Sequence, residues 1–239
     1  MSAGRPFVLV NVAMTADGKI APGHRRFVPF GSARDREHLL ELRATADAVM
    51  SGARTVDSYP VNMGAGGVKY RKRRRAAGLA EQNLRIIVSG SGTINPRAEI
   101  FRRRFSPIIL LTTRRAPAAR LRRLANLADD IKICGAKELD FAAALRWLRQ
   151  RWNVRRLLCE GGGELNAALF RAGLVDELHL TICPRIFGGR DAPTLADGVG
   201  VDELAEGARL KLKSMKRIEG DLFLVYAVRG QSRSSKSRS

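Results

Sequence analysis

The residues with the clearest chemical potential form the segment Glu160-Gly161-Gly162-Gly163, which follows a short apolar run at 157–159. Glycines allow backbone angles that are closed to other residues, and they let backbone N–H groups at a helix start approach an anion such as a pyrophosphate. Glu160 is an acid at the end of a predicted buried strand, the edge at which open α/β sheets bind ligands. The segment predicts a phosphate-binding loop with a carboxylate beside it, although a turn with a solvated Glu160 explains the same residues.

The elements that position this segment are predicted strands alternating with helices. Apolar residues at Leu165, Ala168 and Leu169 have helical spacing, and Gly173 is expected to end that helix. Strands are predicted at 7–13, 48–50, 84–88, 108–112, 131–134, 157–159 and 177–183. This alternation predicts one α/β domain over 1–229 with a mixed, mostly parallel sheet, and alternating apolar residues at 209–215 and 222–228 predict a C-terminal antiparallel hairpin.

Several shorter patterns have structural explanations of their own. Ser32 followed by Asp35 is typical of a helix N-cap, which accounts for Asp35 and leaves a direct chemical role open. The range 57–82 is glycine-rich and basic without a period and predicts a loop or insertion, while 51–56 predicts a small-residue turn. Cys134, Cys159 and Cys183 lie in strand-like segments without paired spacing, so we expect buried thiols and neither disulfides nor a metal site.

The net charge of +20 is spread over much of the chain. Lys69 and residues 71–75 carry six positive charges, and the segment after Val228 carries four without an acid. Such a surface attracts polyanions non-specifically, and it also suits an anionic small-molecule substrate, so no specific nucleic-acid partner is expected. The composition of 230–239 predicts a disordered basic tail. We find no run of eighteen apolar residues and no signal pattern, and we expect a cytoplasmic protein without a membrane partner.

Taken in order, several motifs resemble the reductase family of riboflavin biosynthesis. They are Asn11-Val12-Ala13-Met14-Thr15, Asp17-Gly18-Lys19-Ile20-Ala21, Leu42-Arg43, Gly52 with Thr55-Val56, Cys159-Glu160-Gly161-Gly162-Gly163, and Pro184-Arg185-Ile186-Phe187-Gly188-Gly189. This family comprises 2,5-diamino-6-ribosylamino-4(3H)-pyrimidinone 5′-phosphate reductases and the C-terminal half of bifunctional deaminase-reductases. The resemblance implies a dihydrofolate-reductase-like three-layer fold with helices on both faces of the sheet. It also implies a homodimeric oxidoreductase that uses NADPH to convert a ribosylamino group into a ribitylamino group.

The resemblance also implies roles for individual residues. Cofactor contacts are expected at Ala13, Thr55, Ser89, Gly90, Gly161, Gly162, Gly163, Glu164 and Leu165. Arg43 and Glu160 are expected to contact the substrate, and Glu160 is the expected catalytic residue because a carboxylate would stabilise the cationic iminium that accepts hydride. The zinc deaminase module is not expected, since no H-x-E with a C-x-x-C partner occurs.

One segment departs from the family pattern. The acid that commonly lies four positions after the threonine is replaced by Tyr59, and the basic position expected to meet the substrate phosphate has no clear counterpart before Lys69. Two alternatives therefore stay open. One is an NADPH-dependent reductase of a pterin-like or other bicyclic substrate, and the other is a basic nucleic-acid-associated protein on an inactive reductase scaffold.

Overall fold

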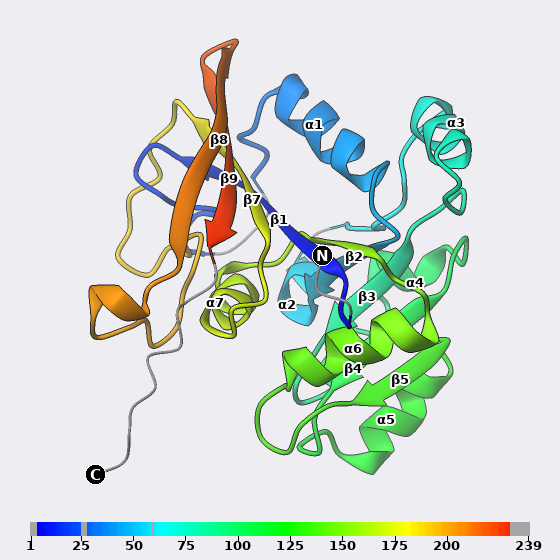
Figure 1. Cartoon of the computed structure of the whole chain (residues 1–239). Coiled ribbons are helices and arrows are strands. Elements are labelled where there is room, and N and C mark those ends of the chain that lie inside the picture. The colour runs from blue at the N-terminus through cyan, green and yellow to red at the C-terminus, as the bar shows by residue number, and fades with distance from the viewer. Residues whose placement is uncertain (1–3, 25–27, 59, 230–239) are drawn as a thin grey trace.

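The computed structural model describes residues 4–24, 28–58 and 60–229, and its nine strands form one sheet (Figure 1). The strand order is β5-β4-β3-β2-β6-β1-β7-β9-β8. The strands are β1 (Phe7–Thr15), β2 (Ala48–Gly52), β3 (Leu84–Val88), β4 (Ile108–Thr112), β5 (Asp130–Ile133), β6 (Arg156–Cys159), β7 (Glu177–Cys183), β8 (Arg209–Ile218) and β9 (Asp221–Arg229). Tyr59 and the tail at 230–239 lie outside the described residues.

The helices alternate with these strands along the chain. They are α1 (Ala33–Arg43), α2 (Ala53–Ser58), α3 (Val68–Ala76), α4 (Glu99–Arg102), α5 (Ala118–Ala125), α6 (Phe141–Arg151) and α7 (Gly163–Arg171), with a 3-10 turn η1 (Leu204–Glu206). Ser32 accepts a hydrogen bond from the Asp35 N–H, so the predicted N-cap is confirmed, and Asp140 caps α6 by accepting one from the Ala143 N–H. Gly173 follows α7 with φ of 64°, a conformation that favours glycine at a helix end.

The first seven strands pair in parallel, and the last two form an antiparallel hairpin. β9 runs antiparallel to β7, and β8 runs antiparallel to β9. Glu219 and Gly220 join this hairpin with φ values of 52° and 92°, as a two-residue turn with two positive φ angles requires. The sheet is therefore mixed and mostly parallel, and the expected C-terminal hairpin is present.

Alternating side chains divide the core between the two faces of the sheet. Val8, Val10 and Val12 of β1 belong to one apolar cluster, whereas Leu9 belongs to the other. The first cluster includes buried residues of α6 and α7, and the second includes residues of α1, α2, α4 and α5. Helices thus cover both faces, as the three-layer expectation required.

The range 57–82 is not wholly a loop or insertion, so this expectation is wrong for α3. Its apolar period is absent because Tyr70 and Arg74 supply the buried face of α3. The buried Arg74 guanidinium donates hydrogen bonds of 2.6 and 2.5 Å to the carbonyl oxygens of Arg43 and Ala46 at the end of α1. The predicted turn at 51–56 is also wrong from residue 53 on, where α2 begins directly after β2.

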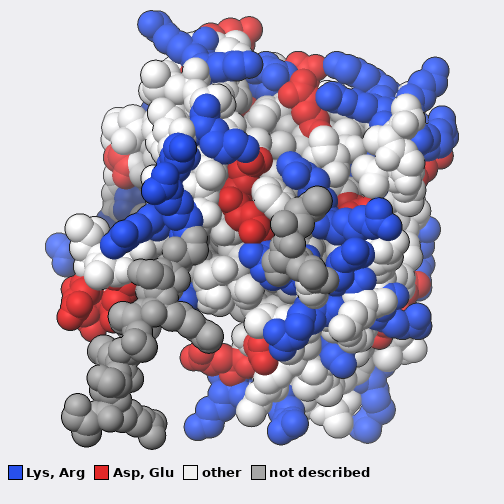
Figure 2. Space-filling view, viewed as in Figure 1, with Lys and Arg blue, Asp and Glu red and all other residues white. Residues whose placement is uncertain are grey.

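The basic charge is dispersed over the surface that Figure 2 shows, where lysines and arginines alternate with acids and uncharged side chains. Part of the charge on α3 is paired, since Lys69 lies 2.8 Å from Glu37 and Arg75 lies 2.8 Å from Glu81. None of the helices within the described ranges is long and apolar enough to cross a membrane. The three cysteines are free and buried, as expected.

Candidate active site

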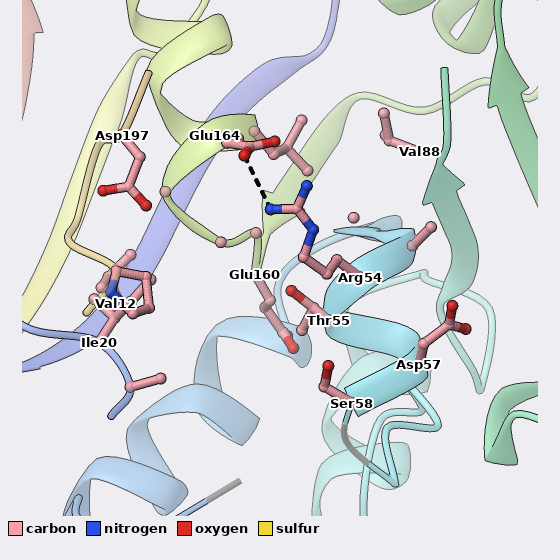
Figure 3. A pocket seen from close by; sticks show the side chains of 18 of the residues that line it. Val12, Ile20, Arg54, Thr55, Asp57, Ser58, Val88, Glu160, Glu164 and Asp197 are labelled. Carbon is pink, nitrogen blue, oxygen red and sulfur yellow. Dashed lines mark hydrogen bonds and ion pairs between the residues drawn. The ribbon is translucent and has the colours of Figure 1, made fainter. Parts of the chain in front are cut away.

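A cleft of about 880 Å³ opens where the strands β2, β3 and β6 end (Figure 3). Parallel strands bring their carboxyl ends to one edge of the sheet, so segments that are distant in sequence meet there. The predicted contacts that line it are Ala13, Thr55, Ser89, Gly90, Glu160, Gly161, Gly162, Gly163, Glu164 and Leu165. Every predicted site residue except Arg43 therefore lines this cleft.

The glycine loop between β6 and α7 needs two of its three glycines for space and none of them for backbone angle. None of Gly161, Gly162 and Gly163 has a positive φ, so the expectation of angles closed to other residues is wrong. A Cβ on Gly161 would lie 2.9 Å from Leu165, and a Cβ on Gly163 would lie 2.6 Å from the Thr194 carbonyl oxygen and would overlap Asp197. These two glycines allow close packing of the protein against itself.

Gly162 differs from its neighbours because a Cβ there would point into the cleft. The nearest atom to that Cβ is the Thr55 hydroxyl oxygen, at 3.6 Å. Gly162 is also the N-cap of α7 and supplies no side-chain cap for the N–H groups of the first turn. These uncapped donors, at the positive end of the helix dipole, suit an anionic group in the cleft.

The Asn166 side chain and the Asp197 backbone hold this loop in place, since the Asp197 N–H donates a hydrogen bond of 3.0 Å to the Gly163 carbonyl oxygen. Asn166 is fully buried, and its Nδ2 donates hydrogen bonds of 3.3 Å to the Gly161 carbonyl oxygen and 3.0 Å to that of Leu195. Asp197 accepts hydrogen bonds from the backbone N–H and the hydroxyl of Thr194, at 3.0 and 2.7 Å. Neither residue was predicted, because their partners come from a segment 29 residues downstream and a turn without a motif.

Glu160 and Arg43 form a buried ion pair at the side of the cleft. Arg43 Nε and Nη2 each lie 2.6 Å from one Glu160 oxygen, and Nη1 donates to the Gly64 carbonyl oxygen at 2.9 Å. The side chains are only 9% and 12% exposed. Burial alone would lower the pKa of Arg43, but the Glu160 charge and hydrogen bonds outweigh burial and raise it. Arg43 thus lies behind Glu160 and is not among the residues that line the cleft.

The opposite rim of the cleft is strongly polar and partly basic. Arg54 of α2 pairs with Glu164 of α7 at 2.9 Å, and both side chains are more than 60% exposed (Figure 3). Ser89 and Gly90 follow β3, and Arg115 approaches them from the turn after β4. Among the described residues, the Arg115 guanidinium has no hydrogen bond or ion pair, which leaves its donors available to a ligand.

Asp35 also lines the cleft, from the first turn of α1. In the sequence, the helix cap was a sufficient explanation for Asp35. That explanation gave no reason to expect its side chain at the cleft. Burial raises the pKa of Asp35, and the nearby Asp221 acts in the same direction, whereas Thr181 and Arg36 oppose it. Sequence patterns offered no signal for this environment, because Asp221 is 186 positions away on β9.

Proteins of known sequence resemble this chain over nearly all its length. The chain is 34% identical over 226 residues to the 2,5-diamino-6-ribosylamino-4(3H)-pyrimidinone 5′-phosphate reductase of Methanothermobacter thermautotrophicus, covering 95% of this chain and 100% of the relative. It is 32% identical over 223 residues to the reductase of the same name from Archaeoglobus fulgidus, covering 93% and 98%. The match to the riboflavin biosynthesis protein RibD of Actinobacillus pleuropneumoniae, at 29% identity, covers 94% of this chain but 57% of that protein.

Solved structures support the expected fold class. A pyrimidine reductase-like protein of Corynebacterium diphtheriae superposes with a TM-score of 0.79 at 22% identity, covering 93% of this chain and 92% of that one. The Thermotoga maritima deaminase/reductase superposes with a TM-score of 0.70 at 18% identity, covering 94% and 57%. The dihydrofolate-reductase-like α/β fold is thereby confirmed. Residues 6–224 match the family model described as the RibD C-terminal domain, and the chain belongs to this family.

Proposed function

We propose that this protein is an NADPH-dependent oxidoreductase that converts the ribosylamino group of a pyrimidinone 5′-phosphate into a ribitylamino group in riboflavin biosynthesis. The observation that carries the proposal is the near full-length match to two reductases of that name. The cleft supports it, because its volume of about 880 Å³ lies within the usual range for sites of cofactors and small ligands.

The residues of the glycine loop fit a nicotinamide dinucleotide. The uncapped N-terminus of α7 offers backbone N–H donors to a pyrophosphate, and Gly162 and Thr55 line the cleft beside these donors. Ala13, Ser89, Gly90, Glu164 and Leu165 line the same cleft and would complete the cofactor site. When bound, the cofactor supplies the hydride, and the protein supplies position and charge.

Glu160 has the role of orienting the substrate and stabilising positive charge that develops on it. Both its oxygens accept hydrogen bonds from Arg43, so this carboxylate is held in one orientation and presents no proton. Arg43 is better described as the residue that positions Glu160 than as a direct substrate contact, because its own donors are occupied.

A preference for NADPH over NADH would come from Arg115. Its guanidinium lies close to Gly90, where a Cβ would be 3.4 Å from Arg115 Nη2, at the end of the cleft away from Ala13. A guanidinium can bind the 2′-phosphate that distinguishes the two cofactors with two parallel hydrogen bonds. The homodimeric state and the cytoplasmic location expected from the sequence stay predictions. No observation favours a pterin-like substrate or a nucleic-acid-associated role.

The proposal is tested with purified protein, NADPH and the ribosylamino-pyrimidinone phosphate. We expect oxidation of NADPH, followed by absorbance, and formation of the ribitylamino product, identified by mass spectrometry. Gly162→Val should fold normally, because its φ of −78° and ψ of 174° suit any residue, and yet lose NADPH binding. A wild-type protein that binds NADPH without reducing this substrate would contradict the proposed substrate, and one that does not bind NADPH would contradict the proposed cofactor.

A further inference from the structure

The contact between α1 and the sheet contains buried polar atoms without hydrogen-bond partners among the described residues. They are Asn11 Oδ1, Asp35 Oδ1, Thr181 Oγ1 and Asp221 Oδ2. Buried polar atoms are nearly always hydrogen-bonded in folded proteins, and an unpaired one reduces stability. Four such atoms on neighbouring strands and one helix therefore call for a functional explanation.

The strand register places these groups beside the cleft. Thr181 of β7 pairs with Ala13 of β1, which lines the cleft, and Cys183 pairs with Thr15. Asp35 faces Thr181 and Asp221, and both acids act on the thiol of Cys183. The Asp35 carboxyl thus stands at the Ala13 end of the cleft, with Asp221, Thr181 and Cys183 behind it and Arg36 beside it on α1.

The two acids of the cleft have opposite environments. Glu160 is paired with a buried guanidinium, whereas the described residues form no ion pair with Asp35. Burial and the Asp221 charge both raise the pKa of Asp35, and only Thr181 and Arg36 oppose them. When two carboxyl groups of one site differ in this way, the paired one acts as an anion and the unpaired one can keep a proton.

Opening of a ribosylamine requires a proton that Glu160 cannot give. We propose that Asp35 is the proton donor of this reaction, an inference that rests on the function proposed above. The Asp35 proton passes to the ring oxygen O4′ as the C1′–O4′ bond breaks, and the bonding pair stays on that oxygen. The lone pair of the attached nitrogen forms the C1′=N bond. The products are the Asp35 carboxylate and an open-chain iminium cation, to which a bound nicotinamide cofactor would supply hydride at C1′.

Asp221 is a positioning residue in this scheme. It lies on β9 behind Asp35, is only 3% exposed, and does not line the cleft. Its charge favours the protonated form of Asp35. Removing that charge should lower the pKa of Asp35 and thus shift the loss of activity to lower pH, without removing the proton donor itself.

The test compares turnover, NADPH affinity and thermal stability of wild type, Asp35→Asn and Asp221→Asn over a range of pH. Glu37→Gln, on the same helix but paired at the surface with Lys69, is the matched control. We expect Asp35→Asn to bind NADPH normally and to lose at least about 100-fold in turnover, as expected for loss of a positioned general acid. Wild-type turnover should fall as pH rises through the Asp35 pKa, and Asp221→Asn should show that fall at lower pH.

Two further measurements separate proton donation from a structural role. In the absence of NADPH, Asp35→Asn should be more thermally stable than wild type at high pH, and the difference should shrink as pH falls. The pKa of Asp35 is raised in the folded protein, so the folded protein binds this proton more tightly than the unfolded chain does. Wild type therefore loses stability as pH rises from the unfolded pKa of this carboxyl to its folded pKa, and Asp35→Asn does not. With NADPH deuterated at both C4 positions, the isotope effect on turnover should be smaller in Asp35→Asn than in wild type, because ring opening then limits the rate.

The outcomes are distinguishable. Wild-type turnover of the pyrimidinone phosphate together with normal turnover of Asp35→Asn would overturn the Asp35 assignment and leave the proposed function intact. Two other results would also overturn the assignment. One is residual turnover of Asp35→Asn that falls at the same alkaline pH as wild-type turnover, and the other is a variant less stable than wild type at high pH. Failure of wild type to reduce this substrate would overturn the proposed function and this inference together.

Discussion

Helices α7 and α1 cover opposite faces of the central strands, and their contacts differ in chemistry. α7 contributes Leu165 and Leu169 to an apolar cluster in which most members are completely buried. α1 contributes Leu42 near its end, but its first turns place Asp35 and His38 against the sheet. The α7 contact mainly fixes the position of the glycine loop. The α1 contact is less stabilising, but it places titratable groups beside the cleft.

The polar contact extends beyond Asp35. His38 Nε2 lies 3.2 Å from His179 Nδ1, and His179 Nε2 lies 2.8 Å from Glu177. Lys213 of the exposed hairpin also reaches Glu177, at 2.5 Å. These groups form a chain from the buried face of α1 to the surface, whereas Leu165 and Leu169 of α7 pack within an apolar cluster.

Truncation of the apolar contact should have the largest effect on stability. Leu169 is fully buried, so Leu169→Ala should reduce the free energy of unfolding by about 2–5 kcal/mol. Turnover of the folded fraction should change much less, because the side chain does not line the cleft. Urea unfolding and turnover at low temperature check both parts, and normal stability would mean that α7 does not depend on this contact.

The second prediction concerns the buried ion pair between Arg43 and Glu160. Glu160→Gln keeps the shape and removes the charge, so turnover should fall by about 100-fold, equivalent to about 3 kcal/mol, while NADPH affinity changes little. The variant should also lose stability, because the buried Arg43 guanidinium is left without a counter-charge.

The control for this variant is Glu99→Gln, which removes an acid from a surface ion pair with Arg102 and should alter stability by less than about 1 kcal/mol. Single-turnover hydride transfer and melting temperature are measured on both variants. An unaltered rate in Glu160→Gln would exclude Glu160 from the mechanism, whatever happens to its stability.

The sequence predicts the buried strands better than the surface helices. The ranges 84–88, 108–112 and 177–183 agree with β3, β4 and β7. Runs rich in isoleucine, leucine and valine indicate the first two strands, and alternation of polar and apolar residues indicates the third. α3 was missed because its packing uses Tyr70 and Arg74, and a buried arginine that caps another helix has no apolar period. α4 was missed because four residues are too few to show a period.

The candidate site was predicted as a set of segments, but not as a set of contacts. Residues with a motif, such as the glycine loop, were placed at the cleft because parallel strands end at one edge. The Arg43–Glu160 pair joins residues 117 positions apart, so the sequence could not show that Arg43 faces Glu160 instead of open space. The environment of Asp35 also comes from residues far away in the sequence, Thr181 and Asp221. The helix cap explained Asp35 without reference to them.

The third prediction returns to the α7 side of the cleft, at its cofactor end. Arg115→Ala should weaken NADPH binding by about 10- to 100-fold, the equivalent of about 1.5–3 kcal/mol for a charge-assisted contact, and leave NADH binding nearly unchanged. Arg114→Ala is the matched control, because Arg114 is an exposed neighbour that does not line the cleft. Fluorescence titration with both cofactors measures the difference, and equal losses for NADPH and NADH would show that Arg115 does not recognise the 2′-phosphate.

The smallest expected effect comes from the histidines of the polar contact. Burial lowers the pKa of both His38 and His179, so the unfolded chain binds protons at a higher pH than the folded protein does. Stability contributed by the neutral pair is therefore present above the unfolded pKa of about 6.5 and is lost as pH falls below it. His38→Gln removes one titrating group but keeps a side-chain amide that can donate to His179, so the variant should lose less stability than wild type on acidification.

Urea unfolding of both proteins at several pH values measures this loss of stability. The difference between them at about pH 8 is the baseline, because both histidines are then neutral. Parallel losses in the two proteins would show that the polar contact under α1 does not titrate, and that its contrast with the α7 contact is one of shape alone.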